Sequence, residues 1–145
     1  MSLLRRVVFD TSTLVGAALK PGSVPHQALG RALARCEVYA SAQTWLELER
    51  VMQPDRLGRF LGRDARVEFA ALMRQSMHFF VVTPANEAAL QPSCRDAKDL
   101  KFLALLKVCR ADVLVSSDED LLVLNPRQGV PVLQPAEFLS YLGAP

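Results

Sequence analysis

Two short apolar runs of the sequence each end in a carboxylate. Val7–Phe9 leads directly into Asp10, and the segment 112–117, DVLVSS, leads into Asp118. Hydroxyl residues adjoin the acid in both places. Because the carboxyl ends of parallel strands lie at one edge of an α/β sheet, we expect Asp10 and Asp118 to meet there if their strands are neighbours.

Two further acids are expected at the same edge. Asp99 lies in the first turn of a helix that follows a predicted strand, and Glu47 lies two turns into another such helix. Glu49 lies ~200° away from Glu47 around that helix, so only one of the two can point at the site. Four carboxylates in one crevice repel each other unless a cation neutralises them. Oxygen ligands without cysteine or histidine indicate Mg²⁺ or Mn²⁺.

Each acid also has a purely structural explanation. Asp99 could favour the helix dipole with Asp96 as the N-cap, Asp118 could form a turn, and Glu47 could be a solvated helix residue. Asp10 is the hardest to explain in this way, because a lone acid at the end of a buried strand is costly without a partner. The coincidence of all four at one edge favours a functional site.

These acids must be positioned by an alternation of strands and helices. The predicted strands are 7–9, 37–40, 79–83, 112–117 and 130–133. The predicted helices are 14–19, 26–35, 42–52, 55–61, 64–77 with Asp64 as its cap, a helix that opens at Asp96 or Lys98 and continues to Cys109, and 135–142. Residues 84–95 are predicted to be irregular, with one helical turn around 87–90. Such alternation predicts an α/β protein with a mostly parallel sheet flanked by helices.

The bulk composition is that of a folded protein. At 145 residues, half of them apolar, the chain is expected to form a single domain, 1–145. No apolar run approaches the ~20 residues that cross a bilayer. The N-terminus has no pattern of a signal peptide. We therefore expect a cytoplasmic protein without membrane association.

The cysteines and histidines argue against a disulfide framework or a zinc site. The three cysteines are Cys36, Cys94 and Cys109, which are odd in number and widely spaced. Histidine occurs only at positions 26 and 78. We expect reduced, buried thiols.

Several motifs together resemble the PIN-domain family, in particular the bacterial group that includes VapC-like toxin ribonucleases. They are VVFDTSTLVGA at 7–17, SAQTWLELERVM at 41–52, CRDAKDLKFLALL at 94–106, ADVLVSSDEDLL at 111–122 and VPVLQPAEFLSYL at 130–142. The resemblance implies a three-layer α/β/α sandwich with a central, mostly parallel five-stranded sheet. It also implies an Mg²⁺- or Mn²⁺-dependent endoribonuclease, as found in toxin–antitoxin systems.

The resemblance assigns the acidic residues of the family to Asp10, Glu47, Asp99 and Asp118, as metal ligands and catalytic groups. Residues expected to support them are Thr11, Ser12, Ser116, Asp96 and Asp120. The chain departs from the family at Ser12, where relatives often carry asparagine, and at Ser117, where glycine or arginine is common. Neither change removes a metal ligand. The implied partners are an RNA substrate, a cognate antitoxin and a second copy of the chain.

Arginines offer a possible path for RNA. Four of them recur at spacings of three and four residues, namely Arg56, Arg59, Arg63 and Arg66, and Arg31 and Arg35 add a pair. Both phosphate contact and a solvated helix face explain such a run. Pro54, Gly58 and Gly62 interrupt the segment, so these arginines need not share one face.

Two other functions stay open. Asp10 to Leu14, DTSTL, has some likeness to the first motif of haloacid dehalogenase-like phosphohydrolases, in which the aspartate is a nucleophile. That chemistry requires a second acid at the position of Ser12. A PIN scaffold that only binds RNA or protein is the other alternative. Four mutually repelling carboxylates argue against a scaffold without catalytic function.

Overall fold

The computed structural model describes residues 5–90, 96–123 and 129–143. Its strands are β1 (Arg6–Phe9), β2 (Glu37–Ala40), β3 (His78–Phe79), β4 (Val113–Val115) and β5 (Val132–Leu133). Its helices are α1 (Thr11–Leu19), α2 (Val24–Arg35), α3 (Ala42–Val51), α4 (Pro54–Leu57), α5 (Arg63–Ser76), α6 (Pro84–Leu90), α7 (Leu100–Val108), α8 (Glu119–Val123) and α9 (Pro135–Leu142), with a 3₁₀ turn at Ala97–Asp99.

The strands form one sheet in the order β3-β2-β1-β4-β5. Every pairing in it is parallel, which confirms the predicted five-stranded parallel sheet. β1 is the central strand, and β4 is its neighbour, with Phe9 opposite Val115. The two strands that carry Asp10 and Asp118 at their carboxyl ends are therefore adjacent, as the site prediction required.

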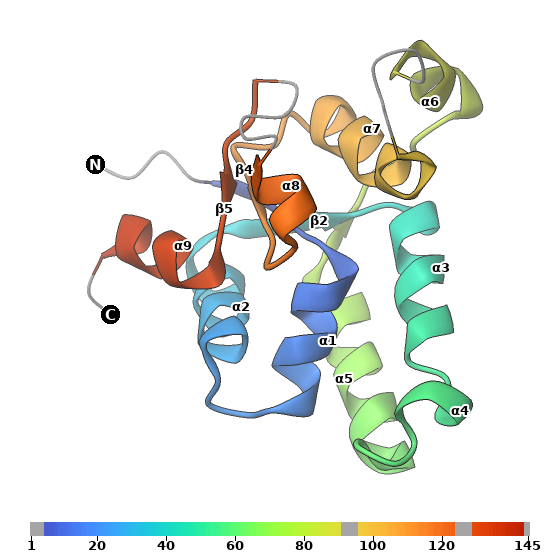
Figure 1. The fold of residues 1–145 in the computed structure, drawn as a ribbon, viewed down its shortest axis with the longest axis vertical. Helices are drawn as coiled ribbons and strands as arrows, with labels where there is room; N and C mark the ends of the chain where they lie inside the picture. Colours follow the sequence, from blue (N-terminus) through green and yellow to red (C-terminus); the bar gives the residue numbers. More distant parts are fainter. Residues whose placement is uncertain (1–4, 91–95, 124–128, 144–145) are drawn as a thin grey trace.

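Helices cover both faces of the sheet, so the molecule has three layers (Figure 1). Val7 and Phe9 pack with residues of α1, α2, α3, α5 and α9 on one face. Val8 points to the opposite face and packs with α7 and with Leu90 of α6. Because neighbouring strand residues point to opposite faces, an apolar run without alternation fits a strand that is covered on both sides.

The helix α1 begins earlier than predicted. Asp10 caps it, with Oδ1 accepting the backbone N–H of Thr13, so the helix starts at Thr11 and not at Leu14. The longer helix α5 begins at Arg63 after Gly62, and Asp64 lies in its first turn, so Asp64 is not the cap. In both cases the backbone becomes helical before the first apolar residue of the pattern.

The third strand is shorter than the predicted 79–83. It pairs at His78 and Phe79, and the backbone N–H of Phe80 makes a last bond to the carbonyl of Ala40. Beyond Ala40 the neighbouring strand has ended, because Ser41 caps α3. Among the described residues, no strand pairs with the chain after Phe80. Pro84–Leu90 forms the helix α6, which includes the helical turn predicted around 87–90 and extends into a segment predicted to be irregular. Residues 91–95 lie outside the described part.

The ends of other elements also differ from the predictions. The fourth and fifth strands are three and two residues long. The predicted short helix 55–61 is the single turn α4, and α2 starts two residues before His26. The arginine run is divided between α4, the following turn and α5, so its members do not share one helix.

Two of the three cysteines lie in the described part of the chain. Cys36 is half-buried, Cys109 is buried, and both are free thiols, whereas Cys94 lies outside the described residues. Burial raises the pKa of the Cys109 thiol to about 11. None of the helices described is long and apolar enough to cross a membrane.

Candidate active site

A cavity of about 540 Å³ lies at the carboxyl edge of the sheet. It is lined by Asp10, Thr11, Ser12, Val15, Gly16, Leu19, Glu47, Val51, Asp96, Lys98, Asp99, Phe102, Asp118 and Leu121. The structure therefore brings together in one cavity the four acids predicted as ligands, and Asp96 with them. They come from β1, α3, the 3₁₀ turn before α7 and the end of β4.

Asp10 is the most enclosed of these acids, with 4% of its surface exposed. Its Oδ1 accepts the backbone N–H of Thr13 at 2.9 Å. Its Oδ2 accepts the hydroxyl of Ser116 and, at 3.3 Å, that of Ser12. These three hydrogen bonds hold the carboxylate at the carboxyl end of β1.

Burial of Asp10 raises the pKa of its carboxyl above the usual value, and the hydrogen bonds from Ser116 and Thr13 offset only part of that effect. The ionised form is therefore costly in the folded protein, because no cation among the described residues contacts it. A carboxylate held in this way favours a bound cation.

Ser116 connects the first and fourth strands. It is fully buried, donates its hydroxyl to Asp10 and accepts the backbone N–H of Asp118 at 3.0 Å. Thr13 supports the same junction, because its hydroxyl accepts the backbone N–H of Ser117 at 3.2 Å. The side chain of Asp118 is exposed to the cavity, and its backbone is held by this network.

Glu47 faces the cavity from α3. Its Oε1 lies 2.9 Å from Nζ of Lys101, and its Oε2 accepts the hydroxyl of Thr11. Glu49 is exposed and lines a separate groove between α3 and α5. The structure thus decides between the two glutamates in favour of Glu47.

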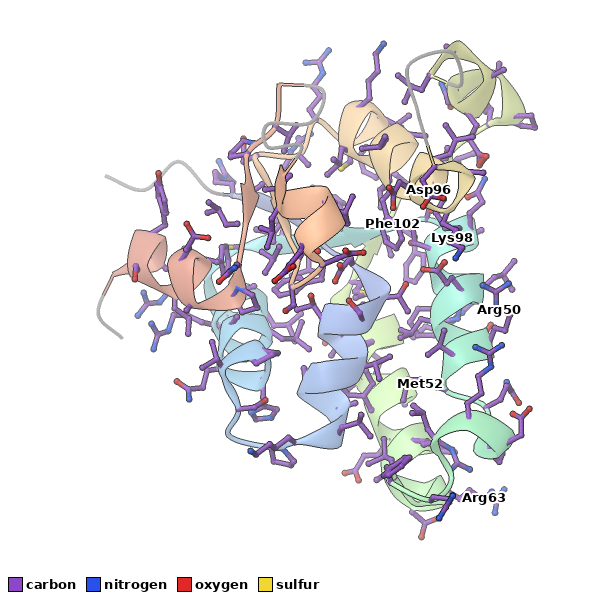
Figure 2. All side chains as sticks on the ribbon, in the orientation of Figure 1. Arg50, Met52, Arg63, Asp96, Lys98 and Phe102 are labelled. Carbon is purple, nitrogen blue, oxygen red and sulfur yellow. The ribbon has the colours of Figure 1, made fainter. Side chains whose placement is uncertain are left out.

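Asp96 and Asp99 lie at the start of the segment that leads into α7. Asp96 caps the 3₁₀ turn, with Oδ1 accepting the backbone N–H of Lys98 at 2.9 Å. Asp99 is half-buried and lines the cavity. Figure 2 shows Asp96, Lys98 and Phe102 where the start of α7 approaches α3. Asp120 belongs to α8, but its side chain lies outside the described part.

Two residues of this site were missed by the sequence reasoning. Neither Thr13 nor Lys101 was assigned a role from the sequence. A signal for Lys101 was available in the sequence, because a lysine two residues after an expected ligand, on a helix that is mostly apolar, needs a polar partner. Which carboxylate it meets depends on α3, 54 residues away along the chain.

The donor chemistry of the cavity fits a hard divalent cation, since its acids offer only carboxylate oxygens. The ligand set is not closed around an ion, however. Within the described ranges, no group of three or more Asp, Glu, His or Cys side chains stands close enough to hold one. The oxygens of Glu47 are bonded to Lys101 and Thr11.

The fold and the cavity define a class of parallel α/β/α proteins with a carboxylate site at the edge of the sheet. The PIN domain model matches residues 6–120, so the chain belongs to the PIN domain family. A comparison with curated proteins gave no match.

Solved structures share the fold at low sequence identity. VapBC2 of Rickettsia felis, bound to a DNA fragment from its promoter, aligns with a TM-score of 0.65 and 10% identity over 89% of this chain and 98% of that one. PAE2754 of Pyrobaculum aerophilum aligns with a TM-score of 0.64 and 14% identity, over 99% of this chain and 93% of that one. VapC20 of Mycobacterium tuberculosis, a sarcin-ricin loop cleaving toxin, aligns with a TM-score of 0.57 and 20% identity, over 81% of this chain and 94% of that one.

Proposed function

We propose that this chain is an Mg²⁺- or Mn²⁺-dependent endoribonuclease that hydrolyses RNA phosphodiester bonds, and that it is the toxin of a bacterial toxin–antitoxin pair. The observation that carries the proposal is the cavity lined by Asp10, Glu47, Asp99 and Asp118. Membership of the PIN domain family supports it, as does the similarity to a toxin described as cleaving the sarcin-ricin loop.

In this proposal Asp10, Asp99 and Asp118 hold a divalent ion directly or through water. A bound ion supplies a water of lowered pKa and offsets the negative charge that develops on the phosphate oxygens. Glu47 orients the attacking water or holds a second ion. No protein nucleophile is required.

The neighbouring polar groups keep these carboxylates in place. Ser116 and the backbone of Thr13 fix the two oxygens of Asp10, and the hydroxyl of Thr11 fixes Glu47. Partners of this kind orient ligands and commonly change metal affinity or activity by about 10- to 100-fold. Ser12 adds a longer bond to Asp10 and could support the site where relatives carry asparagine.

The proposed partners are RNA, a cognate antitoxin and a second copy of the chain. The similarity to VapBC2, solved with a DNA fragment from its promoter, supports a protein partner. Co-purification with the product of the adjacent open reading frame tests it. A reducing, cytoplasmic compartment is part of the proposal, and the free thiols of Cys36 and Cys109 agree with it.

Cleavage of labelled RNA by the purified protein tests the proposed activity. We expect cleavage with Mn²⁺ or Mg²⁺ and none with EDTA. Asp10→Asn and Glu47→Gln should each lower the rate by about 100-fold or more, since a lost ligand should cost at least as much as a lost supporting group. Glu49→Gln is the matched control, because Glu49 lies on the same helix outside the cavity, and it should cleave like the unmodified protein.

Other outcomes would identify other functions. Cleavage that survives both EDTA and Asp10→Asn belongs to a contaminant. Binding of RNA without cleavage would indicate a scaffold. A covalent phosphate analogue on Asp10, trapped with beryllofluoride, would indicate a phosphohydrolase, although Ser12 stands where that chemistry needs its second acid.

A further inference from the structure

The ammonium group of Lys101 is held by three contacts at the start of α7. It lies 2.9 Å from Oε1 of Glu47 and donates to the carbonyl oxygen of Lys98 at 3.1 Å. It also stands 5.9 Å from the centre of the Phe102 ring. The Lys101 side chain is 22% exposed and that of Glu47 is 16% exposed, so this ion pair is partly shielded from water.

A second cation lies near Glu47 but binds it weakly. Arg50 on α3 places its guanidinium 3.9 Å from the same oxygen, and its side chain is 67% exposed. An ion pair this exposed and this long contributes little in water. Lys101 is therefore the principal positive charge on Glu47 among the described residues.

The position of Lys101 matters because of the charges around it. Asp10, Asp96, Asp99 and Asp118 line the same cavity as Glu47, whereas, in the described part of the chain, Lys98 is the one basic residue in that lining. Carboxylates that share a site raise the free energy of each other's ionised form. A positive charge fixed on one of them relieves that repulsion in the protein without metal.

We propose that Lys101 is a built-in counter-ion of the acidic cavity and that it competes with the divalent cation for Glu47. The inference rests on the proposed function, because it concerns the same metal site. An ion that takes Oε1 of Glu47 as a ligand displaces Lys101 from that oxygen, and the cost of breaking the ion pair lowers the affinity for the ion. Lys101 is a positioning residue in this scheme and takes no part in the reaction.

Calorimetry of Mn²⁺ binding tests this without reference to activity. The full chain is treated with EDTA and dialysed before Mn²⁺ is added. Lys101→Met, which keeps most of the length of the side chain and removes its charge, should bind Mn²⁺ about tenfold more tightly than the unmodified protein. Lys101→Arg should bind like the unmodified protein. Lys107→Met, a charge removed from the last turn of the same helix, should have no effect.

Competition at Glu47 is distinguished from a general effect of charge by a double-mutant cycle. In the Glu47→Gln background, the ion pair is already absent. There, Lys101→Met should change the affinity by about twofold or less. A full tenfold gain in that background would overturn competition at Glu47.

Equal or weaker Mn²⁺ binding by Lys101→Met, when circular dichroism shows it folded, would also overturn the inference and leave the proposed nuclease intact. Lys101→Gln repeats the test if the methionine variant does not fold. If neither the unmodified protein nor any Lys101 variant binds Mn²⁺, the metal site of the proposed function is wrong, and the inference is wrong with it.

Discussion

At the scale of single residues, Asp10 has two roles that conflict energetically. It caps α1, which stabilises the fold, and it is a nearly enclosed carboxylate whose pKa is raised by burial. Strained or desolvated groups at functional sites commonly lower stability. Asparagine is also a good N-cap, so Asp10→Asn removes the charge and keeps the cap.

We expect Asp10→Asn to be more stable than the unmodified protein at pH 7 without metal. The folded state holds the Asp10 proton more tightly than the unfolded state, whose carboxyl has a pKa near 3.8. The free energy of unfolding therefore falls as the pH rises from about 3.8 through the raised pKa. The melting temperature of the variant should be higher by about 2–4 °C for each ~1 kcal/mol gained in the free energy of unfolding.

Thermal unfolding in EDTA between pH 3.5 and 7.5 measures the difference in melting temperature between Asp10→Asn and the unmodified protein. This difference should become smaller as the pH falls toward 3.5. Glu68→Gln, which changes an exposed carboxylate on α5, serves as the control and should show no such gap. A less stable Asp10→Asn protein at pH 7 would mean that its hydrogen bonds outweigh the cost of burying its charge.

At the scale of elements, α3 is positioned by its N-terminal cap. Ser41 is fully buried at the end of β2, and its hydroxyl accepts the backbone N–H of Thr44, while the Thr44 hydroxyl accepts the N–H of Ser41. This capping box begins the helix directly where the strand ends. Glu47 follows within two turns and is thereby directed at the cavity.

Ser41→Ala should lower the free energy of unfolding by about 1–2 kcal/mol, because it removes the cap of α3 and leaves a buried N–H without its acceptor. Urea unfolding followed by circular dichroism measures the free energy of unfolding. The slope of that free energy against urea concentration should be unchanged. Ser140→Ala on α9, where the serine is exposed inside a helix, should cause no loss. An equal loss in both variants would contradict the importance of the cap.

At the scale of the whole molecule, the cavity is assembled from segments that only the parallel sheet brings together. Its acids belong to the ends of β1 and β4 and to the helical segments that follow β2 and α6. An ion bound among them would connect these segments in the folded protein and would have no comparable site in the unfolded chain. Metal binding should therefore be visible as stability.

Mn²⁺ at about 100 times its dissociation constant should raise the free energy of unfolding by about 2.7 kcal/mol, and EDTA should reverse the gain. Thermal unfolding with and without Mn²⁺ measures it. Asp118→Asn should lose most of the gain, and Asp55→Asn, an exposed acid on α4, should keep it. The same gain in both variants would place the ion outside the cavity.

The local sequence pattern was sufficient to predict much of the fold. The apolar runs before Asp10 and Asp118 predicted two buried parallel strands, and these are β1 and β4. The ends of elements were less predictable. The apolar segment 79–83 predicted a full strand, but its neighbour β2 ends at Ala40, so only its beginning pairs. The length of a strand depends on its partner, which the segment itself does not specify.

The sequence by itself determined which residues carry charge and that several acids follow strands of a parallel sheet. Only the tertiary structure decided which groups meet: Glu47 and not Glu49, Ser116 on Asp10 across 106 residues, and Lys101 on Glu47. The reason is physical. Periodicity specifies which face of an element is buried, whereas contacts between distant elements depend on the order of the strands and on the packing of α7 against α3.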